Sequence, residues 1–283
     1  MLHDLRIRGY PGLPYELERD IFELTARAHP NCAPGLTLVA GYVQIWVEAV
    51  IYETIVLGRN CVSQDLFWRT FSSRPPEFFT KNIRILHLTS GISRTRARDI
   101  ISVCTKLSSL TCWANPLDGG QEFSRVLSPE LRYLSVNASL LWPMSTETIM
   151  PDLTLPLFTH ITHLEIVNPL PWFDWAPLLD GSLPHLTHVA FGDLYAAHAE
   201  GMTSFFRDAF ASEDPKLQML IAVSRDEHFL AALERENIKD PRLICLPSYH
   251  HPKSLHDYWD SVARRELQFW DPRDMVVNVV AKD

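Results

Sequence analysis

The chain of 283 residues carries 34 acidic and 26 basic side chains, which gives a formal net charge of −8. Its hydrophobic fraction of 46% and charged fraction of 21% are typical of globular proteins and argue against a disordered chain. The acidic balance argues against a broad nucleic-acid interface, which would need a basic face.

The cysteine pattern and the lengths of the apolar runs indicate the cellular compartment in which the protein would function. The five cysteines are odd in number and include no CxxC pair, so neither a disulfide framework nor a zinc knuckle is expected. The N-terminal residues contain no signal-peptide core, and no run of about 18 apolar residues is present. We therefore expect an intracellular protein, cytoplasmic or nuclear, with neither a membrane nor a nucleic acid as partner.

Helical spacing of apolar residues begins after an unpatterned N-terminal tail. Pro14 suits the first turn of a helix, where its missing N–H costs nothing, and His29-Pro30 ends the run. Two further apolar stretches extend from Leu36 to Val43 and from Trp46 to Ile55. Together they predict three short helices.

From Ile83 onward a short phrase recurs, in which apolar residues occupy the first, fourth and sixth positions. Steps between the middle residues of successive phrases are 24, 24, 30, 25, 31 and 24. A period in the twenties is the sequence signature of a leucine-rich repeat, in which each phrase forms one parallel strand. The clear copies are Ile83-x-x-Leu86-x-Leu88, Leu107-x-x-Leu110-x-Cys112, Leu131-x-x-Leu134-x-Val136, Ile161-x-x-Leu164-x-Ile166, Leu186-x-x-Val189-x-Phe191 and Leu217-x-x-Leu220-x-Ala222. A seventh, poorer copy ends in Ile244-x-Leu246.

The segments between these strands should return along the convex side, mostly as helices. Ser93 is a suitable N-cap for a helix that extends to Leu107. The asparagine ladder of regular repeats is absent apart from Asn115, so an irregular arc is expected. The further expected helices cover Phe123 to Leu127, Met202 to Ala211, Glu227 to Asn237 and, as a C-terminal cap, residues 255–270.

The sequence thus predicts an α/β fold: an irregular leucine-rich-repeat solenoid of parallel strands and convex helices behind a small α-helical head. The four expected regions are a tail of residues 1–11, a helical domain of residues 12–57, a linker of residues 58–80 and a repeat domain of residues 81–283.

The helical head resembles an F-box. The residues that carry the resemblance are Leu13-Pro14-Tyr15-Glu16-Leu17, Ile21-Phe22, Leu36-Thr37-Leu38-Val39 and Trp46. The head departs from the family pattern at Ala40-Gly41-Tyr42, where a cysteine and a basic residue are usual. An F-box followed by leucine-rich repeats is similar to the expanded F-box-like families of mushroom-forming fungi, as is the C-terminal pattern Tyr258-Trp259 and Phe269-Trp270.

In F-box proteins the corresponding residues dock the Skp-type adaptor of a cullin–RING ubiquitin ligase. By position, the resemblance implies an adaptor-binding set of Leu13, Pro14, Leu17, Ile21, Phe22, Val39 and Trp46. The alternative is that the same residues only form a helical cap for the first repeat.

Residues that flank the strand apolars should line the concave face of the array, side by side at strand spacing. Their mixture of aromatic, hydroxyl and histidine groups favours protein binding. The expected substrate-binding residues are His87, Thr111, Trp113, Tyr133, Asn137, His163, Glu165 and His188.

A doubled His-x-x-His pattern is the most reactive feature of this face. His163 and His188 should lie on neighbouring strands, and with Glu165 they would make a two-histidine, one-carboxylate metal site conceivable. The simpler interpretation is that Thr-His is a recurring pair before each strand, so no metal or cofactor is assigned. No nucleophile elbow, P-loop, GxGxxG or HExxH motif is present, and no catalytic residue is assigned.

The favoured function is a non-catalytic substrate receptor of an SCF-type ubiquitin ligase, in which the head binds the adaptor and the concave face binds a protein substrate. The alternative is a repeat scaffold that binds protein without ligase association.

Overall fold

The computed structural model divides the chain into two compact units, residues 1–53 and 54–283, which we call the helical unit and the sheet unit. The residues that it describes are 12–58, 64–89, 91–113, 130–142, 153–154, 158–211, 216–247, 258, 261–262 and 269–270.

Three helices form the described part of the helical unit: α1 (Tyr15–Ala28), α2 (Ala33–Leu36) and α3 (Gly41–Ile51). Pro14 directly precedes α1, as its fixed φ favours. The expected second helix, Leu36 to Val43, is wrong: residues between α2 and α3 form turns, in which the Leu38 N–H donates to the Gly35 carbonyl at 3.2 Å. Five side chains close a small core: Ala26, Ala33, Val43, Trp46 and Val47.

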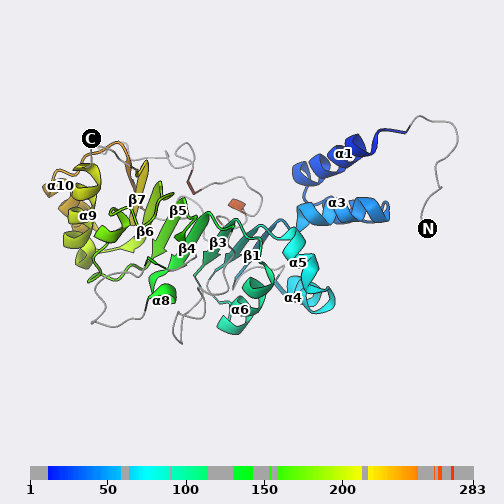
Figure 1. Cartoon of the computed structure of the whole chain (residues 1–283), viewed down its shortest axis with the longest axis horizontal. Helices are drawn as coiled ribbons and strands as arrows, with labels where there is room; N and C mark the ends of the chain where they lie inside the picture. The colour runs from blue at the N-terminus through cyan, green and yellow to red at the C-terminus, as the bar shows by residue number, and fades with distance from the viewer. Residues whose placement is uncertain are drawn as a thin grey trace. The chain divides into compact units, whose positions relative to one another are not determined.

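An eight-stranded, all-parallel sheet organises the described part of the sheet unit, with its strands in chain order (Figure 1). The strands are β1 (Thr54–Leu57), β2 (Ile85–Leu88), β3 (Ser109–Cys112), β4 (Tyr133–Asn137), β5 (His163–Val167), β6 (His188–Leu194), β7 (Met219–Ser224) and β8 (Leu243–Leu246). The protein is therefore α/β, as predicted.

At the start of the sheet unit, the secondary structure differs in two places from that predicted from the sequence. Thr54 to Leu57 form β1, parallel to β2, where the third helix was expected to continue to Ile55. Three β-branched residues in succession, Thr54, Ile55 and Val56, suit a strand that pairs with β2. The expected linker of residues 58–80 contains two helices, α4 (Gln64–Ser73) and α5 (Pro76–Asn82). Phe67 and Phe79 are buried between them, with ring centroids 6.1 Å apart.

The six clear phrases all lie on strands, in the expected register. Their middle residues form one continuous row across the sheet, and their last residues form another; both rows are at most 2% exposed. The first row is Leu86, Leu110, Leu134, Leu164, Val189 and Leu220, and the second is Leu88, Cys112, Val136, Ile166, Phe191 and Ala222. The seventh phrase was placed one residue too late, because Leu220 pairs with Leu243 and not with Ile244.

Helices and short turns connect the strands. They are α6 (Arg94–Val103), α8 (Ala138–Leu141), α9 (Ala199–Ala211), α10 (Glu227–Arg235) and the 3-10 turns η2 (Ala176–Leu178) and η3 (Ala196–His198). The helices expected at Ser93, Met202 and Glu227 are confirmed, and the Ser93 hydroxyl accepts a hydrogen bond from the Arg96 N–H as an N-cap. The helix expected at Phe123 to Leu127 lies outside the described residues, as does most of the C-terminal one.

Candidate protein-binding surfaces

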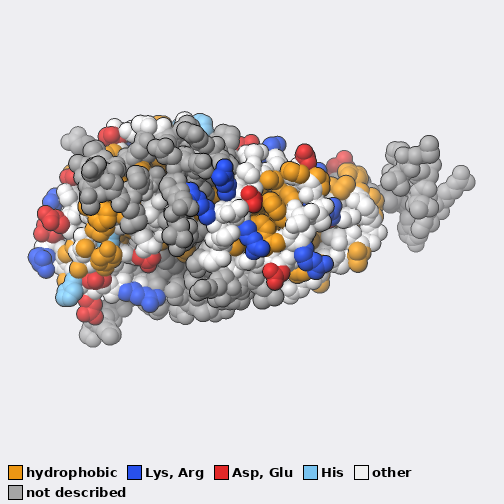
Figure 2. Space-filling view, turned by 90° about the horizontal axis from the view of Figure 1, so that it is seen from below, with side chains coloured by type: hydrophobic (Ala, Val, Ile, Leu, Met, Phe, Trp, Pro, Cys, Tyr) orange, Lys and Arg blue, Asp and Glu red, His pale blue; other side chains and the backbone are white. Residues whose placement is uncertain are grey.

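The helical unit exposes large apolar side chains on and just before α1, on α3 and in the turn between α2 and α3, which we call together the helical apolar face. Its large apolar side chains are between 45% and 86% exposed, although helices normally bury such residues. Orange side chains gather over these helices in Figure 2. The face consists of Leu13, Tyr15, Leu17, Ile21, Leu24, Leu38, Val39, Tyr42 and Ile45.

The expected adaptor-binding residues divide between this face and the core. Leu13, Leu17, Ile21 and Val39 belong to the face, and Pro14 is also exposed. Trp46 is only 5% exposed and packs against Tyr15, Phe22 and Tyr42, with ring centroids 4.7, 6.5 and 5.0 Å away. Phe22 is partly buried against the same core. These two side chains therefore shape the helical unit and contribute little area to its surface.

Three exposed residues of the C-terminal part of this face were missed: Leu38, Tyr42 and Ile45. Helical periodicity places Ile45 opposite the core residues Val43, Trp46 and Val47 of α3, and Tyr42 beside Trp46. Leu38 lies in the turn between α2 and α3, where no helical period applies. Leu24 fits the helical spacing predicted for α1, but it was not assigned to a binding site. Periodicity alone could not distinguish the buried stripe of α1 from an exposed one.

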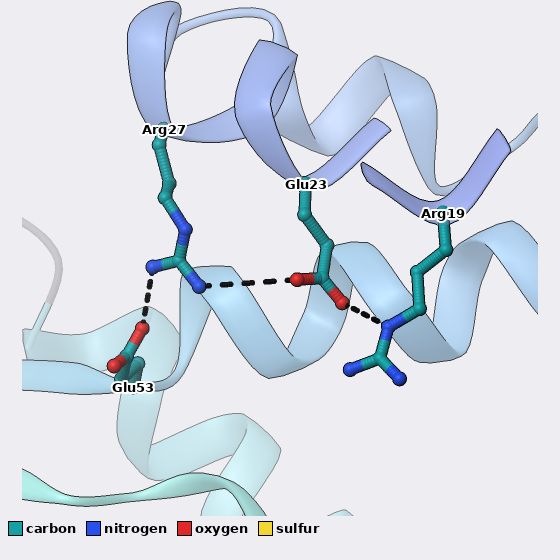
Figure 3. A network of polar contacts seen from close by, with 4 residues as sticks. All are labelled: Arg19, Glu23, Arg27 and Glu53. Carbon is teal, nitrogen blue, oxygen red and sulfur yellow. Dashed lines mark hydrogen bonds and ion pairs between the residues drawn. The ribbon is translucent and has the colours of Figure 1, made fainter. Parts of the chain in front are cut away.

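Ion pairs occupy another side of α1 (Figure 3). Arg19 and Glu23 are 2.5 Å apart, and Arg27 lies 2.7 Å from Glu53 and 4.0 Å from Glu23. The Arg27–Glu53 pair joins the end of α1 to the residue that closes the helical unit. Because the i, i+4 pairs bind along one side of the helix, the apolar stripe of Leu17, Ile21 and Leu24 is left on another.

The second candidate surface is the sheet face that carries the variable residues of each phrase. Parallel pairing aligns these residues in two rows. The outer row is Ile85, Ser109, Tyr133, His163, His188 and Met219, and the inner row is His87, Thr111, Ser135, Glu165, Ala190 and Ile221.

Aromatic rings in the outer row stack on one another. Ring centroids are 4.2 Å apart for Tyr133 and His163, and 4.1 Å apart for His163 and His188. Tyr133 is 40% exposed, and both histidines are half-buried. Burial and the neighbouring His188 lower the pKa of His163 to about 4, so its ring is neutral at pH 7.

The inner row is closed to solvent. His87, Thr111, Ser135 and Glu165 are only 5–8% exposed. His87 Nδ1 and Thr111 Oγ1 lie 2.9 Å apart in a hydrogen bond, and burial lowers the pKa of His87 to about 4. Three of the expected substrate-binding residues, His87, Thr111 and Glu165, are thus covered and offer little surface to a partner.

The other expected substrate-binding residues lie at the edge of this row. Trp113 is half-buried and donates a hydrogen bond from Nε1 to the Ser135 hydroxyl at 2.8 Å. Asn137 caps α8, because its Oδ1 accepts from the Ser139 N–H at 3.1 Å. Trp113 and Asn137 thus lie at the carboxyl ends of β3 and β4, whereas Tyr133 lies at the amino end of β4.

The chain's own C-terminal residues pack on the sheet face. Phe269 and Trp270 contact a buried apolar cluster formed by Ala190, Met219, Ile221 and Val223. The Trp270 ring lies 5.1 Å from His163 and 5.9 Å from His188, in both cases edge-to-face. Residues expected to cap the end of the solenoid therefore cover part of the predicted binding surface.

No metal centre is evident in this part of the molecule. Within the described ranges, no group of three or more histidine, cysteine, aspartate or glutamate residues is placed to hold a metal ion. The His163–His188 pair stacks face to face, with 17° between the rings, and does not converge on a common point. Burial raises the pKa of the Cys104 thiol to about 12, so this thiol is not a nucleophile at neutral pH.

Comparisons with known proteins assign no function. No protein-family model matches the chain, and no curated protein matches it. Among the helices that the structure describes, none has the length and apolar character needed to cross a bilayer. The helical apolar face and the sheet face are therefore the two features from which a function is inferred.

Proposed function

We propose that this protein is a non-catalytic substrate receptor of an SCF-type ubiquitin ligase. In this proposal the helical unit is an F-box-like head that docks a Skp-type adaptor, and the sheet unit is an irregular leucine-rich-repeat solenoid that binds a protein substrate. Such a receptor would work in the cytoplasm or nucleus and would need no cofactor.

The exposed helical apolar face is the observation that carries the proposal. Large apolar side chains that stay exposed in such number on a small unit are a common mark of an interaction site. Leu13, Leu17, Ile21 and Val39, which the F-box resemblance assigns to adaptor docking, are all on this face. Leu17, Ile21 and Leu24 follow one another along one side of α1 and could pack together on an apolar partner surface.

The parallel sheet supports the second half of the proposal. Strands in chain order, each returning through a connection of about one repeat, present their variable residues as continuous rows. The exposed Tyr133 and the partly exposed Trp113 provide aromatic groups of the kind enriched in protein interfaces.

A pull-down with purified Skp-type adaptor tests the proposal. The full chain should retain the adaptor, and a Leu17→Asp, Ile21→Asp double variant should lose binding by at least about tenfold, because burying an unpaired carboxylate costs several kcal/mol. Leu66→Asp is the matched control, since Leu66 is an exposed leucine of α4 outside the helical unit. Circular dichroism must show that all three proteins are folded.

The alternative function is a repeat scaffold without ligase association, in which the head only caps the array. Failure of the intact, folded chain to retain the adaptor would favour this alternative. Equal retention by the double variant and by the intact chain would place the adaptor contact elsewhere and would also contradict the proposal.

A further inference from the structure

The sheet face is filled on its C-terminal side by aromatic residues from the end of the chain. Phe269 and Trp270 pack on Ala190, Met219, Ile221 and Val223, with Ile244 and Leu246 of β8 completing the cluster. Both rings are partly buried by this packing, and aromatic side chains contribute large apolar areas to protein interfaces. The cluster therefore has the composition of the centre of an interface, formed within one chain.

Contacts between Trp270 and two histidine rings accompany this apolar packing. The Trp270 ring lies beside the histidine stack of the outer row and is steeply inclined to both rings, at 71° to His163 and 85° to His188. Edge-to-face packing against stacked rings fixes the orientation of an indole better than an aliphatic surface does. The neutral state of His163 at pH 7 keeps this contact free of a charge that would need hydration.

A second aromatic residue from the same end of the chain is buried within electrostatic range of Glu165 in the inner row. Tyr258 is 4% exposed, and its pKa is raised by burial and by the nearby Glu165 carboxylate. Ser261, three residues later, is 1% exposed. The face thus receives a phenol near a buried carboxylate and an indole against two histidines.

None of the described C-terminal residues is a strand of the sheet. Tyr258 and Ser261 are helical, Phe269 and Trp270 form a turn, and the sheet order ends with β8. Side-chain packing, rather than strand pairing, accounts for the contacts that we describe. Contacts of this kind can open locally while the parallel ladder stays intact.

We propose that the sheet face across β5–β8 binds an aromatic-rich peptide segment of a partner protein, and that the chain's own Tyr258, Phe269 and Trp270 occupy this site until such a segment displaces them. The inference rests on the proposed use of the sheet face for a protein substrate, and it specifies the chemistry of that substrate. The partner segment presents a tyrosine or tryptophan together with apolar side chains. A tethered occupant competes at an effective concentration on the order of millimolar, so only a segment with good complementarity gains access.

Peptide binding to the full chain tests this site directly. The probe is a fluorescein-labelled peptide with the sequence of residues 257–271, measured by fluorescence anisotropy. A Phe269→Ala, Trp270→Ala double variant should bind it at least tenfold more tightly than the unmodified chain, because its internal competitor is weakened. Equal affinity for the two proteins, or no binding to the folded double variant, would overturn the proposal.

Two controls make the result specific. A peptide in which alanine replaces the tyrosine, phenylalanine and tryptophans should not bind the double variant. Trp172→Ala removes an exposed tryptophan that lies outside the cluster, and it should leave peptide binding as in the unmodified chain. Binding of the alanine peptide, or tighter binding to the Trp172 variant, would indicate non-specific adsorption and would count against the site.

Hydrogen exchange on the unmodified chain provides a test that does not depend on the double variant. Peptic fragments that cover residues 258–270 should exchange at least tenfold faster than fragments of β5–β7, because a displaceable occupant opens without unfolding the sheet. If the fragments of residues 258–270 and those of β5–β7 exchange together in one cooperative event, Tyr258, Phe269 and Trp270 belong to the permanent core. A double variant that fails to fold would show the same. Adaptor docking uses the helical unit, so this outcome is distinguishable from failure of the proposed ligase role.

Discussion

The two candidate surfaces are both rich in apolar side chains, yet one is exposed and the other is largely covered. On the helical apolar face, Leu17, Ile21 and Leu24 lie in solvent along one side of α1. On the sheet face, Met219, Ile221 and Val223 are buried beneath Phe269 and Trp270. The same kind of side chain therefore has two different environments within one molecule.

The difference shows that an apolar surface is covered only where another segment of the chain can pack on it. Burying apolar area stabilises by about 25 cal/mol per Å², so a surface is covered wherever a segment can reach it at acceptable entropic cost. The sheet face has such a segment in the C-terminal residues. No segment among the described residues of the helical unit covers the helical apolar face. Exposed apolar surfaces of this kind are typical of protein-binding sites.

Truncating a buried and an exposed residue should give the largest contrast between these environments. Phe191 is fully buried in the sheet unit, with Trp175 and Phe205 rings 5.3 and 5.5 Å away. Phe191→Ala should lower the free energy of unfolding by about 3–5 kcal/mol, whereas Leu38→Ala on the helical apolar face should change it by less than about 0.5 kcal/mol. Urea unfolding measures both; a cost above about 2 kcal/mol for Leu38→Ala would show that the helical apolar face is covered.

A pH dependence should reveal that the inner row of the sheet face is closed to water. The unfolded chain protonates His87 near its ordinary pKa of 6.5, whereas the folded chain does so only near 4. Stability is therefore fully present above pH 6.5 and falls as the pH is lowered toward 4. Between pH 7 and pH 5 the loss that His87 causes should be about 2 kcal/mol.

His87→Gln is the matched variant for this experiment, because an amide can still hydrogen-bond to the Thr111 hydroxyl but does not titrate. Urea unfolding at the two pH values should show a loss about 2 kcal/mol smaller in the variant than in the unmodified chain. Identical pH dependence of the two proteins would mean that solvent reaches the inner row.

The ion pairs of the helical unit should have the smallest effect. Arg27 and Glu53 are 2.7 Å apart but partly exposed, and exposed pairs contribute little after the cost of fixing both side chains. A double-mutant cycle of Arg27→Ala and Glu53→Ala should give a coupling energy below about 1 kcal/mol that decreases in high salt. A larger, salt-independent coupling would mean that this pair determines how α1 packs on α3.

Strand positions and register were predictable because their signal is local and repeated. The alternation in Leu86, His87 and Leu88 recurs in every phrase, and a strand turns successive side chains to opposite faces. The N-cap of α6, Ser93, is likewise a short-range signal. The last phrase failed because Leu243, Ile244, Cys245 and Leu246 are all apolar, so no alternation distinguishes the two registers.

Segments without a local signal were misassigned. Thr54 to Leu57 become a strand because β2 is available as a partner, although their next neighbours in sequence belong to α3. The same limitation affected the candidate site: His87, Thr111 and Glu165 were correctly placed on one face, but their burial was not foreseen. The pairing of β1 with β2 and the burial of the inner row both depend on residues far apart in the sequence, so local patterns could not predict them.

The sequence by itself determined the α/β class, the parallel strands and the residues that each strand turns to either side, because these depend on backbone periodicity over a few residues. Only the tertiary structure decided which surfaces are covered. The contact of Trp270 with His163 and the packing of Phe269 on Met219 and its neighbours join residues far apart in the chain. Such contacts form only where the fold brings distant segments together, and no local pattern encodes them.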